Sequence, residues 1–219
     1  MRPEEFAREF PCLFHVADIR GWRSILDHGL LSVSAVCEAL QLSAKHREKL
    51  ESQRRTTLKL FEKQPLGTVV LREQGAIHPR ALEAALVDMT VHDWYRELSR
   101  RVFFFPSAEA MRPLLETYHG QRLPQAVFRV DAARLLTKHA QDVSVSAINT
   151  GSAKRRATPR GAATFERLAD FEYAAAPLRR HGIAEVTVDW AVPDFVEYVI
   201  NVERVDAQGS EQLWQPPET

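Results

Sequence analysis

Cysteine, net charge and long apolar runs are all scarce in this sequence of 219 residues. The two cysteines, Cys12 and Cys37, are too few for a disulfide framework and do not have the spacing of metal ligands. The 29 Lys and Arg residues balance the 29 Asp and Glu residues, so the whole chain has no field that attracts nucleic acid or an anionic membrane. No window approaches the roughly 18 apolar residues of a membrane span, and acids occupy the first ten residues, where a signal peptide has an apolar core. We therefore expect a cytoplasmic protein with no membrane partner.

Familiar catalytic and cofactor motifs are also missing. The chain has no GxGxxG, GxxxxGK[ST], GxSxG or HExxH motif and no EF-hand loop. Its eight histidines do not cluster at metal-ligand spacing, so we expect no metal site. Cys12 and His15 resemble a nucleophile pair, but residues three apart in a strand lie on opposite faces, which favours a structural thiol.

What the sequence does contain is an ordinary globular composition, 45% hydrophobic with 12 prolines and 9 glycines, and an irregular series of short elements. The patterns predict strands at 13–16, 67–73, 101–106, 125–131, 143–149, 182–190 and 194–205. They predict helices from Asp18 to Gly29 and at 32–40, 43–63, 79–86, 90–100, 107–118 and 132–137.

The unequal spacing of these elements argues against a regular alternating βαβ sheet. It favours an α+β architecture with mostly antiparallel strands, and the last two, joined by a turn at Pro193, suit a hairpin or a sandwich edge. The sequence has no internal repeat, linker or change in composition. We therefore expect one domain over 1–219, with a helical insertion near 32–64 and a frayed tail at 207–219.

Several polar residues have both an ordinary structural interpretation and a functional one. His15 lies in an apolar strand, and Arg72 ends another. Glu185 shares a strand face with Thr187 and Asp189, and this face is either the solvent side of an edge strand or a site. A basic loop at 150–161 is either solvated or contacts nucleic acid; its cations are Lys154, Arg155, Arg156 and Arg160.

Taken in order, six segments resemble an uncharacterised bacterial family that is itself similar to ADP-ribosyltransferases, distantly to the DarT-type enzymes that modify single-stranded DNA. The segments are HVADIRGWRSILDHGLLS, LREQ, RVFFFP, SAINTG, PRGAATF and AEVTVDWAVPDFVEYVI, from 15 to 200. The resemblance implies an ADP-ribosyltransferase-like split β-sandwich with helical insertions. It implies NAD as a substrate without a metal, and partners that include single-stranded nucleic acid and a cognate antitoxin or hydrolase.

The resemblance also assigns roles to residues. His15 matches the strand-one histidine that touches the nicotinamide end of NAD, Glu185 the late catalytic glutamate, and Arg72 the arginine before the aromatic strand, with Arg101 as its rival. The residues expected to pack on or cover the nicotinamide are Phe103, Phe105, Asn149, Thr150 and Gly151. Two features depart from the pattern: Phe14 replaces a tyrosine, and RVFFFP lacks the polar continuation of that strand.

The implied reaction breaks the nicotinamide–ribose bond through a transition state with oxocarbenium character, like that of glycoside cleavage. A carboxylate beside the ribose stabilises the developing positive charge more in the transition state than in the ground state. The expected function is transfer of ADP-ribose from NAD to a macromolecule, nucleic acid before protein, in a toxin-like enzyme. Two alternatives stay open: an NAD glycohydrolase, and a non-catalytic nucleotide-binding or partner-binding module on the same fold.

Overall fold

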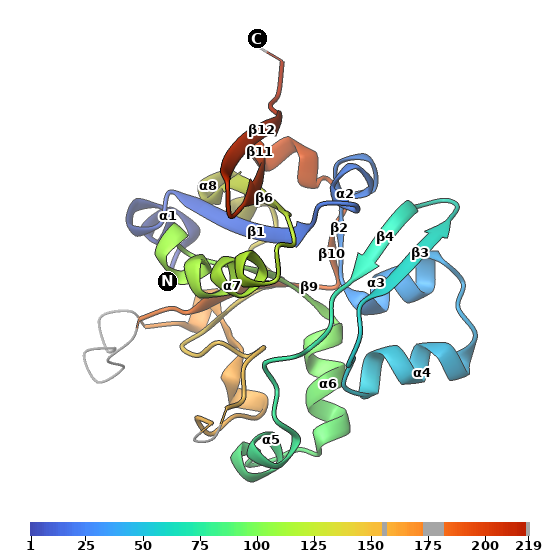
Figure 1. Ribbon diagram of the computed structural model, residues 1–219. Helices are drawn as coiled ribbons and strands as arrows, with labels where there is room; N and C mark the ends of the chain where they lie inside the picture. Colours follow the sequence, from blue (N-terminus) through green and yellow to red (C-terminus); the bar gives the residue numbers. More distant parts are fainter. Residues whose placement is uncertain (155–156, 173–181, 218–219) are drawn as a thin grey trace.

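Two antiparallel sheets carry the fold in the computed structural model, which describes residues 1–154, 157–172 and 182–217 (Figure 1). Within these ranges the first sheet has the order β1 (Cys12–Asp18), β6 (Gln125–Asp131), β11 (Val199–Asp206), β12 (Gly209–Trp214). The second sheet has the order β5 (Arg101–Phe104), β9 (Glu185–Asp189), β7 (Val143–Ser146), β8 (Glu166–Arg167). Every strand pair in both sheets is antiparallel, so the expected mixed architecture of helices and antiparallel strands is confirmed.

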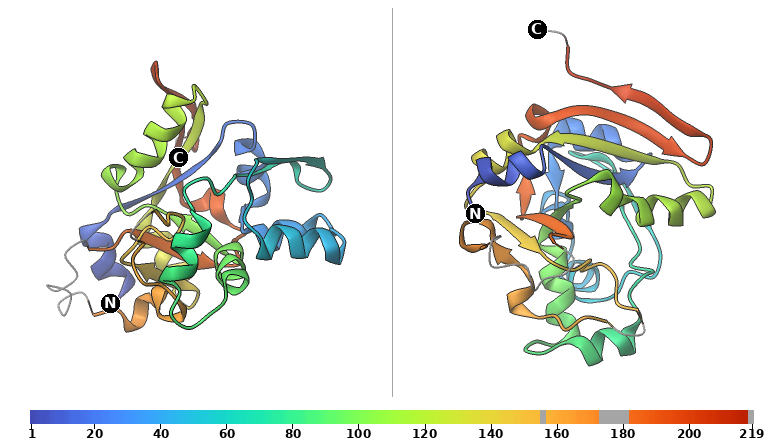
Figure 2. Two further views of the ribbon diagram at one scale, coloured as in Figure 1. Left: turned by 60° about the horizontal axis from the view of Figure 1, so that its bottom comes forward. Right: turned by 90° about the vertical axis from the view of Figure 1, so that its left-hand side faces the viewer.

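A β-bridge joins the two sheets. The amide of Phe14 donates to the carbonyl of Phe105 at 2.9 Å, and the amide of Phe105 donates back to Phe14 at 2.8 Å. This reciprocal pair places β1 beside the end of β5, so the second sheet continues from the edge of the first. In the right-hand view of Figure 2, β11 and β12 form the outer hairpin of the first sheet, far from α5 and α6.

Helices and two small strand pairs surround the sheets. The helices are α1 (Pro3–Glu9), α2 (Trp22–His28), α3 (Val33–Ala39), α4 (Ala44–Ser52), α5 (Pro79–Ala85), α6 (Val91–Ser99), α7 (Ala108–Gly120) and α8 (Ala132–Lys138). The strand pairs are β2 (Leu30–Leu31) with β10 (Ala191–Val192), and β3 (Lys59–Lys63) with β4 (Gly67–Leu71). Short 3₁₀ turns lie at η1 (Ala162–Thr164), η2 (Leu168–Asp170) and η4 (Phe195–Tyr198).

Local sequence explains where several helices begin. The side chains of Ser32, Thr90 and Ser107 each accept a hydrogen bond from the amide three residues later, as N-caps do. Thr90 and Asp93 form the capping box that their spacing predicts. These helix starts are therefore encoded locally.

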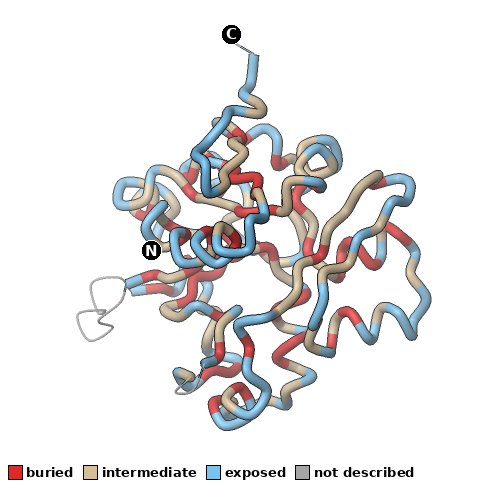
Figure 3. Tube along the Cα trace, viewed as in Figure 1, coloured by how far each residue is buried: buried red, intermediate tan, exposed pale blue. Residues whose placement is uncertain are grey.

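The main core lies on one face of each sheet and joins them. It includes Leu13 of β1, Phe128 of β6, Phe104 of β5, Val186 of β9 and Phe195 of η4, all fully buried. Figure 3 shows buried positions along the strands, whereas the C-terminal segment is exposed. Because side chains alternate along a strand, the neighbours of these core residues point to the opposite faces.

Two predicted helix boundaries are wrong. The helix expected over 43–63 ends at Ser52, and 59–63 forms β3 because Phe61 pairs with Val69 across the hairpin. Tertiary pairing overrides a weak helical pattern there. Asp18 is the last residue of β1 and binds Arg20, so it does not cap α2; Gly21 takes that position.

The prediction for the C-terminal region is also wrong in two places. The strands near 182–190 and 194–205 do not form a hairpin, because β9 belongs to the second sheet and β11 to the first. The segment 209–214, expected to be frayed, forms β12 and pairs with β11. Gly209, with a φ of +137°, allows the tight turn between these strands.

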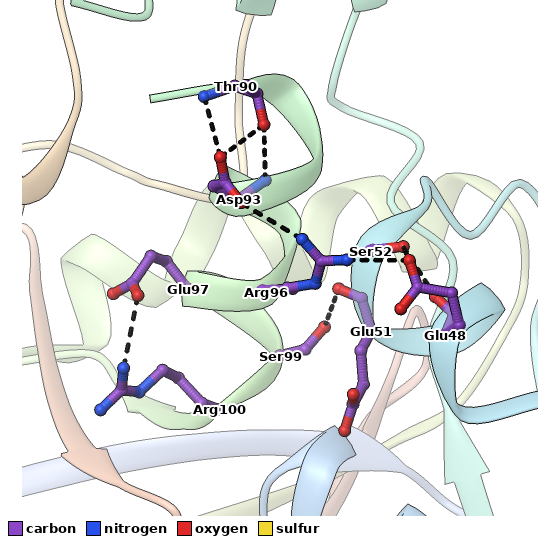
Figure 4. A network of polar contacts seen from close by, with 9 residues as sticks. All are labelled: Glu48, Glu51, Ser52, Thr90, Asp93, Arg96, Glu97, Ser99 and Arg100. Atoms are coloured by element: carbon purple, nitrogen blue, oxygen red, sulfur yellow. Dashed lines mark hydrogen bonds and ion pairs between the residues drawn. The ribbon is translucent and has the colours of Figure 1, made fainter. Parts of the chain in front are cut away.

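Exposed polar contacts line the packing of α6 against α4 (Figure 4). Arg96 on α6 lies 2.8 Å from Glu48 on α4 and 3.2 Å from Asp93 on its own helix. Ser99 donates to the carbonyl of Glu51 at 3.1 Å. Tertiary contacts therefore join two helices that are more than forty residues apart in the chain.

Candidate functional site

Glu185 lies at the start of β9 and points away from the main core. It alternates with Val186 and Val188, which are fully buried in that core, and shares its face with Thr187 as the sequence predicts. β9 is not an edge strand, because it lies between β5 and β7, and its polar face is covered by other parts of the chain. Glu185 is only 5% exposed and Thr187 is fully buried. Burial of a carboxylate is costly unless other groups form hydrogen bonds or ion pairs with it, so Glu185 needs such groups nearby.

Thr150 holds the Glu185 carboxylate in place. Its amide donates to Oε2 of Glu185 at 3.1 Å, and its Oγ1 hydroxyl donates to the same oxygen at 2.6 Å. Burial raises the pKa of Glu185 to about 7, and the Thr150 hydrogen bonds and the positive charge of Arg160 oppose this shift. The carboxyl group therefore changes its charge near neutral pH.

Arg160 is buried beside this carboxylate, contrary to its expected place in an exposed basic loop. It is 3% exposed, and its guanidinium donates to the carbonyl of Ser152 at 2.9 Å and to that of Thr158 at 3.1 Å. Its carbon Cζ lies 5.6 Å from the centre of the Trp94 ring. Arg160 therefore organises its own loop, and its donors do not face outward for nucleic acid.

The rest of the basic loop is described only in part. Lys154 is exposed, as a contact with nucleic acid requires. Arg155 and Arg156 lie outside the described residues. Asn149 and Gly151 flank Thr150 in a turn in which the carbonyl of Asn149 accepts from the amide of Ser152 at 3.3 Å. This turn presents Thr150 to Glu185.

A cavity of about 230 Å³ lies one strand away from Glu185. Ser146, the cross-strand partner of Glu185 on β7, lines it together with Arg160 and Thr164. The apolar part of the wall includes Val87 and Ile148. The cavity therefore combines apolar surface with a few polar groups, as small-ligand sites commonly do.

His15 lies on β1 and points into the main core. Its Nδ1 is 2.8 Å from the carbonyl oxygen of Phe103, and since a carbonyl only accepts, Nδ1 carries the hydrogen. The rings of Phe104 and Phe128 lie 6.0 Å from the imidazole. Burial and, to a smaller extent, the positive charge of Arg72 lower the pKa of His15 to about 4, against the opposing effect of the hydrogen bond to Phe103. His15 is therefore neutral near pH 7, and Nε2 is its acceptor atom.

Arg72 follows β4 and reaches toward β6 and α7. Its guanidinium donates to Oε1 of Gln125 and lies over the ring of Tyr118, with Cζ 4.6 Å from the ring centre. Burial lowers the pKa of Arg72, although the group stays charged. Gln125 and Tyr118, which Arg72 contacts directly, are neutral groups, and the carboxylates of Asp18 and Glu73 act on its charge from farther away.

Arg101, the rival for this role, has a different environment. Its guanidinium lies 2.7 Å from Glu97 and 3.3 Å from Asp189 and packs on the ring of Phe165. Two carboxylates thus neutralise Arg101. The structure favours Arg72 as the cation that is able to bind an anion.

The structure brings the strands of His15 and Glu185 close together but places the two side chains on opposite faces. β5 lies between β1 and β9, so at a strand spacing near 4.8 Å the two backbones are about 10 Å apart, within the length of one NAD molecule. His15 points toward the main core, whereas Glu185 points away from it. A ligand that touches both has to pass the end of β5.

Phe14 is the residue that the sequence-based site omits. It pairs with Phe105, which shares its face with Phe103, and the cross-strand pairing of Phe103 with Thr187 extends this face to Glu185. All three phenylalanines are partly exposed, whereas Phe104 is buried in the main core on the other face. The alternation of β1 carried the signal, because it places Phe14 and His15 on different faces.

A family model matches this chain, but the description of that family names no activity. The model of a family described as "Family of unknown function (DUF7002)" matches residues 11–199, from the start of β1 to the start of β11. No curated protein matches the chain. Among the residues that the structure describes, no helix is both long and apolar enough to cross a membrane. Because the family model covers most of its length, the chain belongs to the DUF7002 family.

Proposed function

We propose that this protein is an NAD-dependent ADP-ribosyltransferase, which cleaves the nicotinamide–ribose bond and transfers ADP-ribose to a macromolecule, in the first place nucleic acid. The observation that carries the proposal is Glu185, a buried carboxylate on a central strand, fixed by two hydrogen bonds from Thr150. Its pKa of about 7 keeps a large fraction ionised at neutral pH. Such a group stabilises positive charge on a ribose in a site that excludes water.

The arrangement of the sheets supports the same proposal. Two antiparallel sheets meet at the Phe14–Phe105 bridge, which agrees with the split β-sandwich that the resemblance implies. β1, β5 and β9 lie side by side at this junction, and they carry His15, the aromatic run and Glu185. The three motifs of the resemblance therefore meet in one region.

The contacts of His15 define how it takes part. Its Nδ1 hydrogen is engaged by the carbonyl of Phe103, and its low pKa keeps Nε2 unprotonated at neutral pH. Nε2 then accepts a hydrogen bond from a ribose hydroxyl. His15 therefore acts as a hydrogen-bond acceptor in the proposed site.

Arg72 serves the anionic part of NAD. Its direct contacts are with the neutral groups Gln125 and Tyr118, and its fork of N–H donors matches the oxygens of a diphosphate. A bound diphosphate then takes the place of the Gln125 contact, beside the more distant carboxylates of Asp18 and Glu73. Phe103, Phe105 and Phe14 supply aromatic surface near Glu185 for the nicotinamide.

One observation favours a second candidate, the non-catalytic binding module. Glu185 is nearly inaccessible, and its Oε2 already accepts two hydrogen bonds. A module that binds NAD without turnover needs no accessible carboxylate. The two candidates differ in whether nicotinamide is released.

Release of nicotinamide from NAD, measured by liquid chromatography with single-stranded DNA, RNA or cell lysate present, tests the proposal. We expect release by the wild type, its loss in Glu185→Gln, and its retention in Glu211→Gln, a matched change of an exposed strand glutamate. Binding of NAD without release supports the module, and no binding at all contradicts both. Labelled ADP-ribose on nucleic acid, on protein or free in solution then distinguishes the acceptors and the glycohydrolase.

A further inference from the structure

We infer that Arg55 is a positioning residue for Arg72, because it fixes the backbone from which the Arg72 guanidinium extends. The inference rests on the proposed function, in which Arg72 binds the anionic part of NAD. Arg55 lies between α4 and β3, outside every motif of the resemblance. Its role follows from where its hydrogen bonds go.

The Arg55 guanidinium joins two separate pieces of backbone. Nε donates to the carbonyl of Arg72 at 3.0 Å, and Nη1 donates to the carbonyl of Leu50 at 3.0 Å. Leu50 lies in the last turn of α4, where carbonyls have no partner within the helix. One planar side chain therefore fixes the end of α4 to the residue that carries the proposed anion-binding group.

The backbone around Arg55 strengthens this link. The amide of Gln74 donates to the carbonyl of Arg55 at 2.7 Å, and the amide of Arg55 donates to Oε1 of Gln74 at 2.8 Å. Arg54 donates to the carbonyls of Gln74 and Gly75, at 3.1 and 3.3 Å. Arg54 thus supports the same segment but does not touch Arg72, which makes it a natural control.

Arg55 is a half-buried arginine without a carboxylate partner among its hydrogen bonds, which is a costly arrangement. Burial lowers the pKa of Arg55 to about 10, and its hydrogen-bond acceptors are neutral carbonyls. A lysine has one nitrogen and a flexible stem, so it does not bridge two carbonyls in a fixed plane. The simultaneous contact with the carbonyls of Arg72 and Leu50 therefore explains why an arginine stands at position 55.

Fixing the Arg72 backbone determines where its side chain can reach. With its carbonyl bound by Arg55, the Arg72 side chain extends to Gln125 on β6 and to the ring of Tyr118 on α7. Without Arg55 the segment after β4 gains freedom, and the guanidinium leaves this position. Displacement of a binding group by about 1 Å reduces the rate of a reaction by up to about 100-fold.

The test compares Arg55→Met with Arg54→Met, which removes the same charge from the adjacent residue. Steady-state nicotinamide release should show a KM for NAD raised about tenfold in Arg55→Met, by misplacement of Arg72, with kcat within about twofold of wild type. Arg54→Met should stay within about twofold in both constants. Arg55→Lys, which keeps the charge and reaches one carbonyl, should give an intermediate KM and guards against a failure of Arg55→Met to fold.

A double-mutant cycle separates positioning from general support of the fold. If Arg55 acts through Arg72, then adding Arg55→Met to Arg72→Met leaves KM unchanged. An unchanged KM in Arg55→Met, or losses that multiply in the double variant, overturns the inference.

A measurement that needs no NAD distinguishes failure of the positioning role of Arg55 from failure of the proposed function. The Tyr118 ring resonance of protein with ¹³C-labelled tyrosine should shift in Arg55→Met as it does in Arg72→Met, and stay in place in Arg54→Met. Absence of that shift overturns the positioning role even if NAD is cleaved. A shift in a protein that neither binds nor cleaves NAD supports the positioning role and contradicts the proposed function.

Discussion

Two polar clusters of this protein each join segments far apart in the chain, yet they differ in contact with water. At the α4–α6 packing, the side chains of Arg96 and Glu48 are 45% and 54% exposed (Figure 4). At the β9 cluster, Glu185 is nearly inaccessible. The pKa of Glu48 is lowered, first by its hydrogen bond from Ser52, whereas burial raises that of Glu185. An exposed carboxylate stays charged at neutral pH and supports the fold. A buried carboxylate has a raised pKa, so its charge changes near neutral pH.

The largest difference between the clusters should appear in activity. We expect Glu185→Gln to reduce nicotinamide release at least about 100-fold, because a neutral amide does not stabilise the positive charge of the transition state. Glu48→Gln should leave the rate within about twofold, since an exposed ion pair contributes little. Initial rates at saturating NAD measure both effects. Equal rates for the two variants would remove Glu185 from the catalytic role.

The pH dependence of stability should differ next. The pKa of Glu185 in the folded protein, about 7, exceeds its ordinary value of 4.5, so the folded state binds more protons between these values. Stability from this group is then present below pH 4.5 and falls, by up to about 3 kcal/mol, as pH rises to 7. Urea unfolding across this range should show that Glu185→Gln abolishes the fall.

His15 provides the opposite slope and a check on that assignment. Its folded pKa of about 4 is below the ordinary 6.5, so the unfolded state binds more protons and stability rises with pH between 4 and 6.5. In Glu185→Gln, this rise should remain and become easier to see. If the wild type and Glu185→Gln have parallel stability profiles, the carboxyl group titrates at its ordinary pKa.

A smaller effect is expected at Thr150. Thr150→Val removes the hydroxyl donor to Oε2 and so raises the pKa of Glu185 further, which moves the rising limb of the pH–rate profile to higher pH. We expect about a fivefold lower rate at pH 7 for a shift of one unit, with recovery at higher pH. Thr150→Ser keeps the donor and should keep the profile. A uniform loss at all pH values would indicate a packing defect instead.

The smallest effect should occur at the exposed cluster. Arg96→Ala removes the contacts with Glu48 and Asp93 and should lower the free energy of unfolding by less than about 1 kcal/mol. High salt should reduce this difference further, because it screens exposed charges. Urea titrations at low and high salt measure it. A loss as large as that of a buried pair would show that the two clusters are energetically alike.

Some elements of the fold are encoded by neighbouring residues in the sequence, whereas others depend on tertiary contacts. The helix that begins after Thr90 and the strand 125–131 are predicted close to their observed bounds, because they depend on neighbouring residues and on simple periodicity. The helix predicted to reach 63 fails because Phe61 finds its partner on β4. Strand β12 is missed because its polar residues pair with β11 at the edge of a sheet.

The candidate site also combines features that are encoded locally with features that depend on tertiary contacts. The face shared by Glu185 and Thr187 follows from alternation, but its burial depends on tertiary contacts, such as that of Thr150 with Glu185. The burial of Arg160 depends on the carbonyls of a loop that no periodicity describes. The relation of Arg55 to Arg72 requires the turn of chain that brings 54–55 against 72–75. The sequence shows the type of each residue but not which residues it contacts in the folded protein.

The Phe14–Phe105 bridge has a mechanical consequence. All seven residues of β1 are paired with β6, whereas within the described residues one bridged pair connects β1 to the strand that continues into the second sheet. A ladder with one rung resists twisting far less than a ladder with many, so the buried core that both sheets share and the hydrogen bond from His15 to Phe103 fix their relative orientation. The bridge lies between His15 and Glu185, and the packing of this shared core therefore sets the gap between them.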